Sequence, residues 1–225
     1  MINSLPAVHP AGVGIIGEDD VIRLSSEPMT WVMAGDSITQ AVLHTHGERG
    51  WVEHLHERIR WQLDRLTDIV VNTGVSGWRA PDVLGSFEHL IGRFRPDVLS
   101  ISLGTNDARA GLAGLDEFRE AMHAIIARSR NECAGVQVVV HTPVLVSLAG
   151  RGARGEQPAY CQAVREIAAE TGALLVDHEA HWRARFQDAD PIPWLDNPAH
   201  PNPVGHLEMA NLTLRALGLG ELSPL

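Results

Sequence analysis

The sequence predicts an α/β protein in which helices cover both faces of one parallel β-sheet. Short apolar runs rich in Val, Ile and Leu recur along the chain, as strands buried on both faces require. Amphipathic stretches separate these runs, and such alternation favours parallel strands joined by right-handed crossovers. The predicted strands span residues 31–34, 69–72, 98–103, 136–141 and 173–176.

The predicted helices lie between these strands and after the last one. In the first of them Val52, Leu55, Ile59 and Leu63 follow helical spacing, and charged residues occupy the opposite face. Helical covers of this kind complete a three-layer α/β/α sandwich. The predicted helices span residues 51–66, 80–93, 115–131, 158–171 and 203–217.

Two segments interrupt this alternation. Residues 12–16 and 21–24 flank a Gly-Glu-Asp-Asp turn and predict a small β-hairpin. We therefore expect residues 1–30 to form an arm appended to a single domain at residues 31–225. Residues 144–157 contain four glycines and follow the fourth strand, so we expect a mobile loop there.

Length and composition exclude several classes of protein. A chain of 225 residues fits one domain with a full core. The formal charge of −10 disfavours a nucleic-acid-binding surface. No apolar run reaches the ~18 residues of a membrane span. The acidic start also lacks the basic region of a secretory signal, so we expect a cytoplasmic protein without membrane contacts.

Three polar groups follow the first three strands in chain order. Ser37 follows the first strand in Gly-Asp-Ser, Gly77 follows the second, and Asn106 follows the third in Gly-Thr-Asn-Asp. The carboxyl ends of parallel strands meet at one edge of the sheet, where ligands bind. A serine nucleophile needs a base, for which His200 is the candidate. It also needs oxyanion donors, here the N–H groups of Ser37 and Gly77 and the Asn106 amide.

Each segment also has an ordinary structural interpretation. Gly-Asp-Ser is a common turn with a helix cap, and Gly-Thr-Asn-Asp is a plausible turn. His200 stands between two prolines and could be a structural loop histidine. The joint occurrence of these segments in this order favours the chemical interpretation.

With these segments the chain resembles the SGNH/GDSL hydrolase superfamily over residues 31–217. The matching blocks are Gly-Asp-Ser at 35–37, Asn-Thr-Gly-Val-Ser-Gly at 72–77, Gly-Thr-Asn-Asp at 104–107 and His-Pro-Asn at 200–202. The resemblance implies ester or thioester hydrolysis on a flavodoxin-like sheet of about five strands in the order 2-1-3-4-5. It also implies Ser37 as nucleophile, Gly77 and Asn106 in the oxyanion hole, and His200 as general base.

One position departs from the family pattern. The acid normally stands three residues before the histidine, where this chain has Asn197, and Asp196 lies one residue earlier. Three alternatives follow: Asn197 orients His200 directly, Asp196 takes the place of the acid, or His200 relies on a backbone carbonyl or water. Because Asn197 precedes a proline and favours extended backbone, the Asp196 side chain should point the opposite way.

We expect the site to work without a metal or an organic cofactor. His44 and His46 follow the serine turn and could line the pocket, but a metal site there is not favoured. A carboxylate at Asp36 would repel the phosphate of a flavin. Trp78 is a candidate substrate contact beside Gly77. Arg109, Arg151 and Arg154 are candidates to hold an anionic substrate, although a solvated face is the simpler interpretation.

The sequence therefore predicts a serine hydrolase that cleaves a carboxylic ester through an acyl-enzyme. The favoured substrate is a short acyl or acetyl ester of a sugar or small metabolite. An acyltransferase with the same Ser-His site and a catalytically silent binding protein are the alternatives. The N-terminal arm makes a homodimer a possible assembly.

Overall fold

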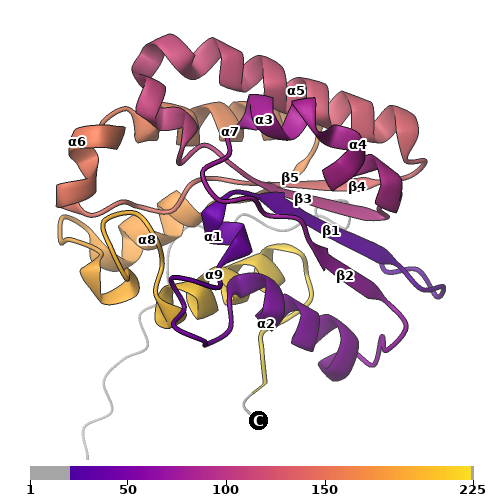
Figure 1. The fold of residues 1–225 in the computed structure, drawn as a ribbon. Helices are drawn as coiled ribbons and strands as arrows, with labels where there is room; N and C mark the ends of the chain where they lie inside the picture. Colours follow the sequence, from indigo (N-terminus) through magenta and orange to yellow (C-terminus); the bar gives the residue numbers. More distant parts are fainter. Residues whose placement is uncertain (1–20, 224–225) are drawn as a thin grey trace, which may run out of the picture.

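The predicted strands form one parallel five-stranded sheet in the computed structural model, which describes residues 21–223. The strand order β2-β1-β3-β4-β5 is the one implied by the family resemblance. β1 and β3 are in register from Trp31 opposite Val98 to Gly35 opposite Ser102, so both end at the same edge (Figure 1). The strands are β1 (Thr30–Gly35), β2 (Ile69–Asn72), β3 (Val98–Ser102), β4 (Gln137–His141) and β5 (Leu174–Val176).

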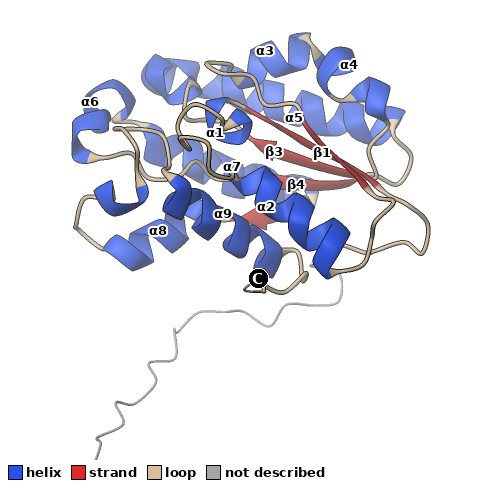
Figure 2. Cartoon of the chain, turned by 60° about the horizontal axis from the view of Figure 1, so that its bottom comes forward, coloured by secondary structure: helices blue, strands red, loops and turns tan. Residues whose placement is uncertain are grey.

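Alternation along β1 separates two hydrophobic cores. Val32 and Ala34 face a core made with α3 (Ala80–Gly85), α4 (Phe87–Leu90), α5 (Leu115–Glu132) and α7 (Gln157–Thr171). Trp31 and Met33 face a second core made with α2 (Trp51–Glu57), α8 (His178–Phe186) and α9 (Pro203–Ala216). Figures 1 and 2 show these helices on the two faces of the sheet, so the three-layer α/β/α prediction is confirmed.

Two predicted helices are shorter or more broken than expected. The helix predicted at 51–66 consists of α2 followed by a π-helical turn at Arg58–Gln62. It stops before residue 66 because Asp64 adopts a positive φ of 55°. The helix at 80–93 divides into α3, α4 and the short 3₁₀ segment Gly92–Phe94. Its breaks at Ser86 and Ile91 have φ values of −111° and −131°, and glycines, which disfavour helix, stand next to both.

One helix was missed, and one segment is more regular than expected. Residues 178–186 form α8, which the sequence pattern did not reveal because charged residues surround this helix and Trp182 and Phe186 are its main apolar contacts. Residues 144–157, where we expected a mobile loop, are helical in their second half. Val144 and Val146 are buried, and the 3₁₀ segment Leu148–Gly150 leads into α6 (Arg151–Arg154).

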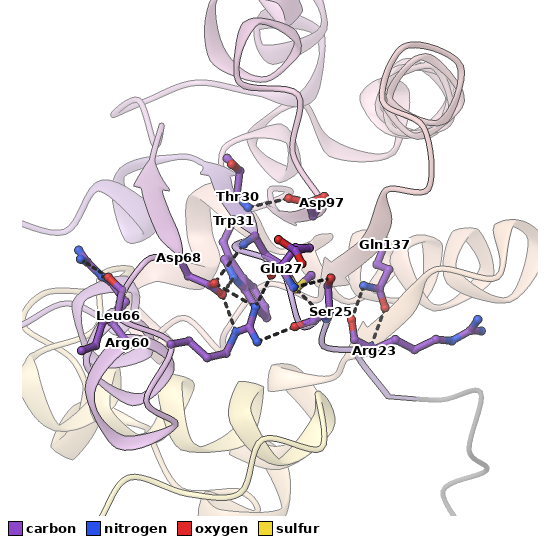
Figure 3. Close-up of polar contacts among 12 residues, drawn as sticks. Arg23, Ser25, Glu27, Thr30, Trp31, Arg60, Leu66, Asp68, Asp97 and Gln137 are labelled. Carbon is purple, nitrogen blue, oxygen red and sulfur yellow. Dashed lines mark hydrogen bonds and ion pairs between the residues drawn. The ribbon is translucent and has the colours of Figure 1, made fainter.

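The segment before β1 is tied to the edge of the sheet opposite the predicted site. Arg23 and Gln137 are paired through backbone and side-chain hydrogen bonds of 2.7 and 3.0 Å (Figure 3). Residues 21–24 form no regular strand, and residues 12–16, the other half of the predicted hairpin, lie outside the described residues. Within residues 21–223, no helix has the length and apolar character needed to cross a bilayer.

Candidate active site

The turn after β1 presents Ser37 at the start of α1 (Ser37–Gln40). Asp36 caps this helix, because its Oδ1 accepts a hydrogen bond of 2.9 Å from the Ile38 N–H. The turn allows no side chain on Gly35, where a Cβ would stand 2.2 Å from Thr39 Oγ1 and 2.7 Å from Ser102 O. Gly74 passes equally close, at 2.5 Å from Gln40 N for an added Cβ. These glycines bring the first two sequence blocks together.

The structure places Ser37, His200 and Asn197 in one hydrogen-bonded series. Ser37 Oγ lies 2.8 Å from His200 Nε2, and His200 Nδ1 lies 2.9 Å from Asn197 Oδ1. Asn197 Oδ1 also accepts the Ala199 and His200 backbone N–H groups, each at 3.1 Å, so this atom must be the amide oxygen. Nδ1 of His200 therefore carries the proton, and Nε2 is free to accept the Ser37 hydroxyl proton.

The His200 loop is held by its own backbone and by the segment after β4. Asp196 N donates to His200 O at 2.9 Å, and Ser147 N donates to Pro198 O at 2.9 Å. Burial lowers the pKa of His200 to about 4, and the positive charges of His44 and Arg154 act in the same direction, while Asp196 opposes them. The imidazole is thus neutral and able to accept a proton throughout the neutral pH range.

Asp196 does not contact His200 with its carboxylate. Its Oδ2 lies 3.1 Å from His44 Nδ1, and its Oδ1 lies 2.5 Å from His46 Nε2. Asn197 Nδ2 joins this group, at 3.1 Å from His44 Nδ1 and 3.3 Å from Asp196 Oδ2. The structure therefore brings Asn197 to His200 and leaves Asp196 on the far side of the Asn197 amide, as the backbone argument predicts.

The predicted oxyanion donors lie around the same turn. Gly77 has a φ of +81°, a conformation that favours glycine, and a Cβ there would meet nothing within 4 Å. Within residues 21–223, the N–H groups of Ser37 and Gly77 have no hydrogen-bond acceptor. Asn106 Nδ2 donates to Trp78 O at 3.1 Å and has a long contact of 3.4 Å to Asp36 Oδ2. The first bond fixes the amide, and the second is weak enough to be exchanged.

Two buried carboxylates brace the loops beneath these donors. Asp107 accepts hydrogen bonds from Ala80 N at 2.9 Å and Gly104 N at 3.1 Å, which join the second and third loops of the site. Burial raises the pKa of Asp107. Asp36 is 2% exposed, and burial raises its pKa to about 7.

The remaining candidates lie at the border of the site. The Trp78 indole is partly buried and packs against the first hydrophobic core, and its carbonyl holds Asn106. Arg154 Nε donates to Thr105 O at 3.0 Å, beside Asn106. In the described part of the chain, no group of three His, Cys, Asp or Glu side chains is placed to hold a metal ion.

Comparison with known proteins agrees with this geometry. The model of the GDSL-like lipase/acylhydrolase family matches residues 33–207. The chain belongs to this family. It lies within the SGNH/GDSL hydrolase superfamily, and its enzyme class is therefore carboxylic ester hydrolase.

Several known proteins resemble this chain. An acetylxylan esterase from Geobacillus stearothermophilus is 26% identical over 159 residues, which cover 66% of this chain and 72% of the esterase. A structure of a catalytic mutant of a Geobacillus stearothermophilus acetylxylan esterase has a TM-score of 0.73 at 23% identity, covering 87% and 97% of the two chains. An alpha/beta hydrolase from the metagenome of Lake Arreo, Spain, has a TM-score of 0.72 at 23% identity, covering 85% and 95%.

Catalytic mutants of the Geobacillus stearothermophilus acetylxylan esterase replace a serine, an aspartate and a histidine, and the last two stand three positions apart. In this chain the residue three positions before His200 is Asn197. An asparagine has nearly the shape of an aspartate, with an amide in place of the carboxylate. The amide can orient an imidazole but supplies no negative charge.

Sequence reasoning missed the role of His44 in this family member. Its ring stacks on the His200 ring, with centroids 3.7 Å apart and planes 17° apart. The signal was the His44-x-His46 pair directly after the serine turn, from which we expected only that these residues could line the pocket. Its real partners, Asp196, Asn197 and His200, lie more than 150 residues away along the chain and come together only through the fold.

Proposed function

We propose that this esterase hydrolyses a short acyl ester, an acetyl ester of a sugar being favoured, through an acyl-enzyme on Ser37. The observation that carries the proposal is the 2.8 Å contact between Ser37 Oγ and His200 Nε2. The fixed Asn197 amide oxygen supports it, because it selects the tautomer in which Nε2 is the base. The 26% identical acetylxylan esterase favours an acetyl group and a sugar.

The proposed mechanism uses residues of this chain alone. Ser37 Oγ attacks the ester carbonyl while His200 Nε2 takes the hydroxyl proton. The N–H groups of Ser37 and Gly77 and the Asn106 Nδ2 group stabilise the oxyanion. His200 then protonates the leaving alcohol, water attacks the acyl-enzyme with His200 again as base, and the carboxylic acid leaves Ser37.

Asn197 holds the imidazole in place but cannot neutralise the imidazolium that forms on His200. In the Ser-His-Asp proteases, replacing the aspartate by asparagine lowers turnover about 10⁴-fold. That loss arises because the asparagine there favours the wrong tautomer. Here the two backbone N–H groups on Asn197 Oδ1 prevent that error. We therefore propose an active enzyme in which the missing charge lowers turnover but the orientation of His200 is kept.

A serine-directed fluorophosphonate and a series of p-nitrophenyl esters test this proposal. Wild-type protein should be labelled on Ser37 and should hydrolyse acetyl and other short esters faster than long ones. Ser37→Ala should lose labelling and lower turnover by about 10⁴–10⁶. Thr39→Ser, two residues further along α1, is the matched control and should keep both. A folded wild-type protein that neither labels nor hydrolyses any ester would establish the silent binding alternative.

A further inference from the structure

A small cavity with a cationic lining lies beside the proposed active site. Its volume is about 210 Å³, and its polar side chains are Arg151, Arg154, Arg183 and Gln157. All four supply N–H donors, and no acidic side chain lines the cavity. Donors without a carboxylate among them fit an oxyanion group such as a carboxylate or a phosphate.

The positive charges of this cavity are only partly compensated by the protein. Arg183 is ion-paired with Glu179. Among the described residues, Arg151 and Arg154 have no carboxylate within ion-pair distance. Burial lowers the pKa of Arg154, the nearby guanidinium of Arg109 lowers it further, and the charge of Asp36 acts in the opposite direction. Two arginines without an ion pair beside a third stand out in a chain whose formal charge is −10.

Gln157 provides a second and independent observation. The residue is 4% exposed and lines the cavity, and its Nε2 has no hydrogen-bond partner among the described residues. An unpaired buried amide is costly, about 1–3 kcal/mol, unless a bound group satisfies it. Nε2 itself is buried, so a ligand oxygen would supply the missing acceptor once the amide turns toward the cavity.

The cavity borders the two loops that carry the proposed chemistry. Arg154 Nε donates to Thr105 O at 3.0 Å, directly before Asn106 of the oxyanion site. The segment that carries Arg151 and Arg154 begins at Ser147, whose N–H holds Pro198 O in the His200 loop at 2.9 Å. Figure 1 shows α6 at the end of the sheet where α1 begins. A group bound here would therefore be close to an ester bound at Ser37.

We propose that Arg151, Arg154 and Gln157 form an anion subsite that binds a carboxylate or phosphate carried by the alcohol part of the ester. This inference rests on the proposed function, because a short acyl group leaves the alcohol part as the carrier of the charge. The substrate class is then an acylated sugar acid, sugar phosphate or similar anionic alcohol. Arg154 lines the cavity and also holds Thr105 O beside Asn106, so an anion bound there would lie close to the oxyanion donors.

Three aryl acetates with the same reacting group test the subsite. 4-Acetoxybenzoate carries a carboxylate, 4-acetoxyphenyl phosphate carries a phosphate, and 4-acetoxybenzamide is the uncharged match. In wild-type protein kcat/KM for at least one anionic ester should exceed that for the amide by about ten- to a hundredfold, as charged hydrogen bonds are expected to give. The better anion identifies which of the two the subsite binds.

Arg151→Gln is the deciding variant because Arg151 makes no ion pair within residues 21–223. It should lower the ratio of anionic to neutral kcat/KM toward one. Arg93→Gln, on the short segment before β3 at the opposite edge of the sheet, is the matched control and should leave the ratio as in wild type. A ratio near one in wild type, or a high ratio that Arg151→Gln does not change, overturns the subsite.

The two proposals fail in different ways. Ser37-dependent hydrolysis of all three esters at similar rates overturns the anion subsite and leaves the esterase mechanism standing. If no ester is hydrolysed, the mechanism fails, and calorimetric titration of Ser37→Ala protein with 4-acetoxybenzoate and 4-acetoxyphenyl phosphate decides the subsite separately. Binding that Arg151→Gln abolishes supports it, and the absence of binding overturns it.

Discussion

Two aspartates at opposite ends of β1 are equally buried, at 2% exposure, yet their pKa values move in opposite directions. Asp68 directly precedes β2 in sequence and lies at the amino end of β1 in space. It accepts hydrogen bonds from Met29 N, Trp31 Nε1 and Arg65 at 2.7–3.0 Å (Figure 3). Burial alone would raise its pKa, but Arg65 and these donors hold the pKa below its usual value. Asp36 directly follows β1, and burial raises its pKa to about 7. The hydrogen bond from Ile38 N opposes this rise but does not offset it.

This difference indicates that polar groups at the amino ends of the strands stabilise the fold, whereas those at the carboxyl ends are left available for function. At the edge drawn in Figure 3, the buried charge of Asp68 is matched by hydrogen-bond donors and by the Arg65 cation. At the other edge, the Ser37 N–H, the Gly77 N–H and Gln157 Nε2 have no hydrogen-bond partner among the described residues. Asp36 there has one good donor, Ile38 N, and a long contact to Asn106 Nδ2. Unsatisfied groups of this kind are found where a substrate supplies the missing partner.

Asp68→Asn should have the largest effect on stability. The change leaves Arg65, whose side chain is 14% exposed, without its anion. Removing one member of a buried pair lowers the free energy of unfolding by about 3–5 kcal/mol. Urea denaturation measures this loss, and kcat/KM of the folded variant should match wild type. Because the folded pKa of Asp68 is lowered, its contribution is present above pH 3.8 and is lost as the pH falls further.

Glu221→Gln is the control for Asp68→Asn. It removes an exposed ion pair with Arg215 and should cost about 0–1 kcal/mol. Equal losses in the two variants would mean that the Asp68 network is no more than a surface contact.

Asp36→Asn should act in the opposite direction. Asparagine keeps an oxygen for the Ile38 N–H and removes a carboxyl whose folded pKa is raised to about 7. Such a group stabilises the fold below its unfolded pKa and loses that contribution as the pH rises through its folded pKa. We expect a gain of up to about 4 kcal/mol in unfolding free energy at pH 8 and little gain at pH 4. Urea titrations at both pH values measure it, and a loss at pH 8 would contradict the comparison.

Asn106→Ala should separate activity from stability. We expect kcat to fall by about 10²–10³, the usual cost of one oxyanion donor. The free energy of unfolding should change by about 1 kcal/mol, because the main bond lost is the one to Trp78 O. Steady-state kinetics with p-nitrophenyl acetate and urea denaturation provide the two readouts. A rise in KM with unchanged kcat would assign Asn106 to substrate binding instead.

The strands and the order of the chemical groups could be predicted because they depend on local sequence. β2 matches its predicted bounds, and Ser37, Gly77 and Asn106 each follow a strand, so a parallel sheet must bring them to one edge. The interruption at Ser86, helix α8 and the stacking of His44 on His200 were not predicted. The stacking joins segments that are distant along the chain, and α8 buries too few apolar residues to show a helical pattern. The break at Ser86 follows Gly85, but one glycine does not show where a helix ends.

The last prediction concerns the departure at Asn197. Asn197→Asp places a carboxylate 2.9 Å from His200 Nδ1 and should raise the pKa of His200, now lowered to about 4, by about 1–3 units. The imidazolium formed during the reaction gains the same stabilisation, so kcat should rise by about 10–10³ at neutral pH. The acid limb of kcat/KM should move upward from about pH 4, because His200 must be neutral to act as base.

Asp196→Asn completes this test in the background of the native Asn197. If Asp196 were the acid, its loss would lower kcat about 10⁴-fold, as in the Ser-His-Asp proteases. Among residues 21–223, its carboxylate contacts only His44, His46 and the Asn197 amide, so we expect a much smaller decrease. A large loss in Asp196→Asn with no gain in Asn197→Asp would mean that the carboxylate reaches His200 through the amide. The charge at this edge would then be displaced by one residue rather than missing.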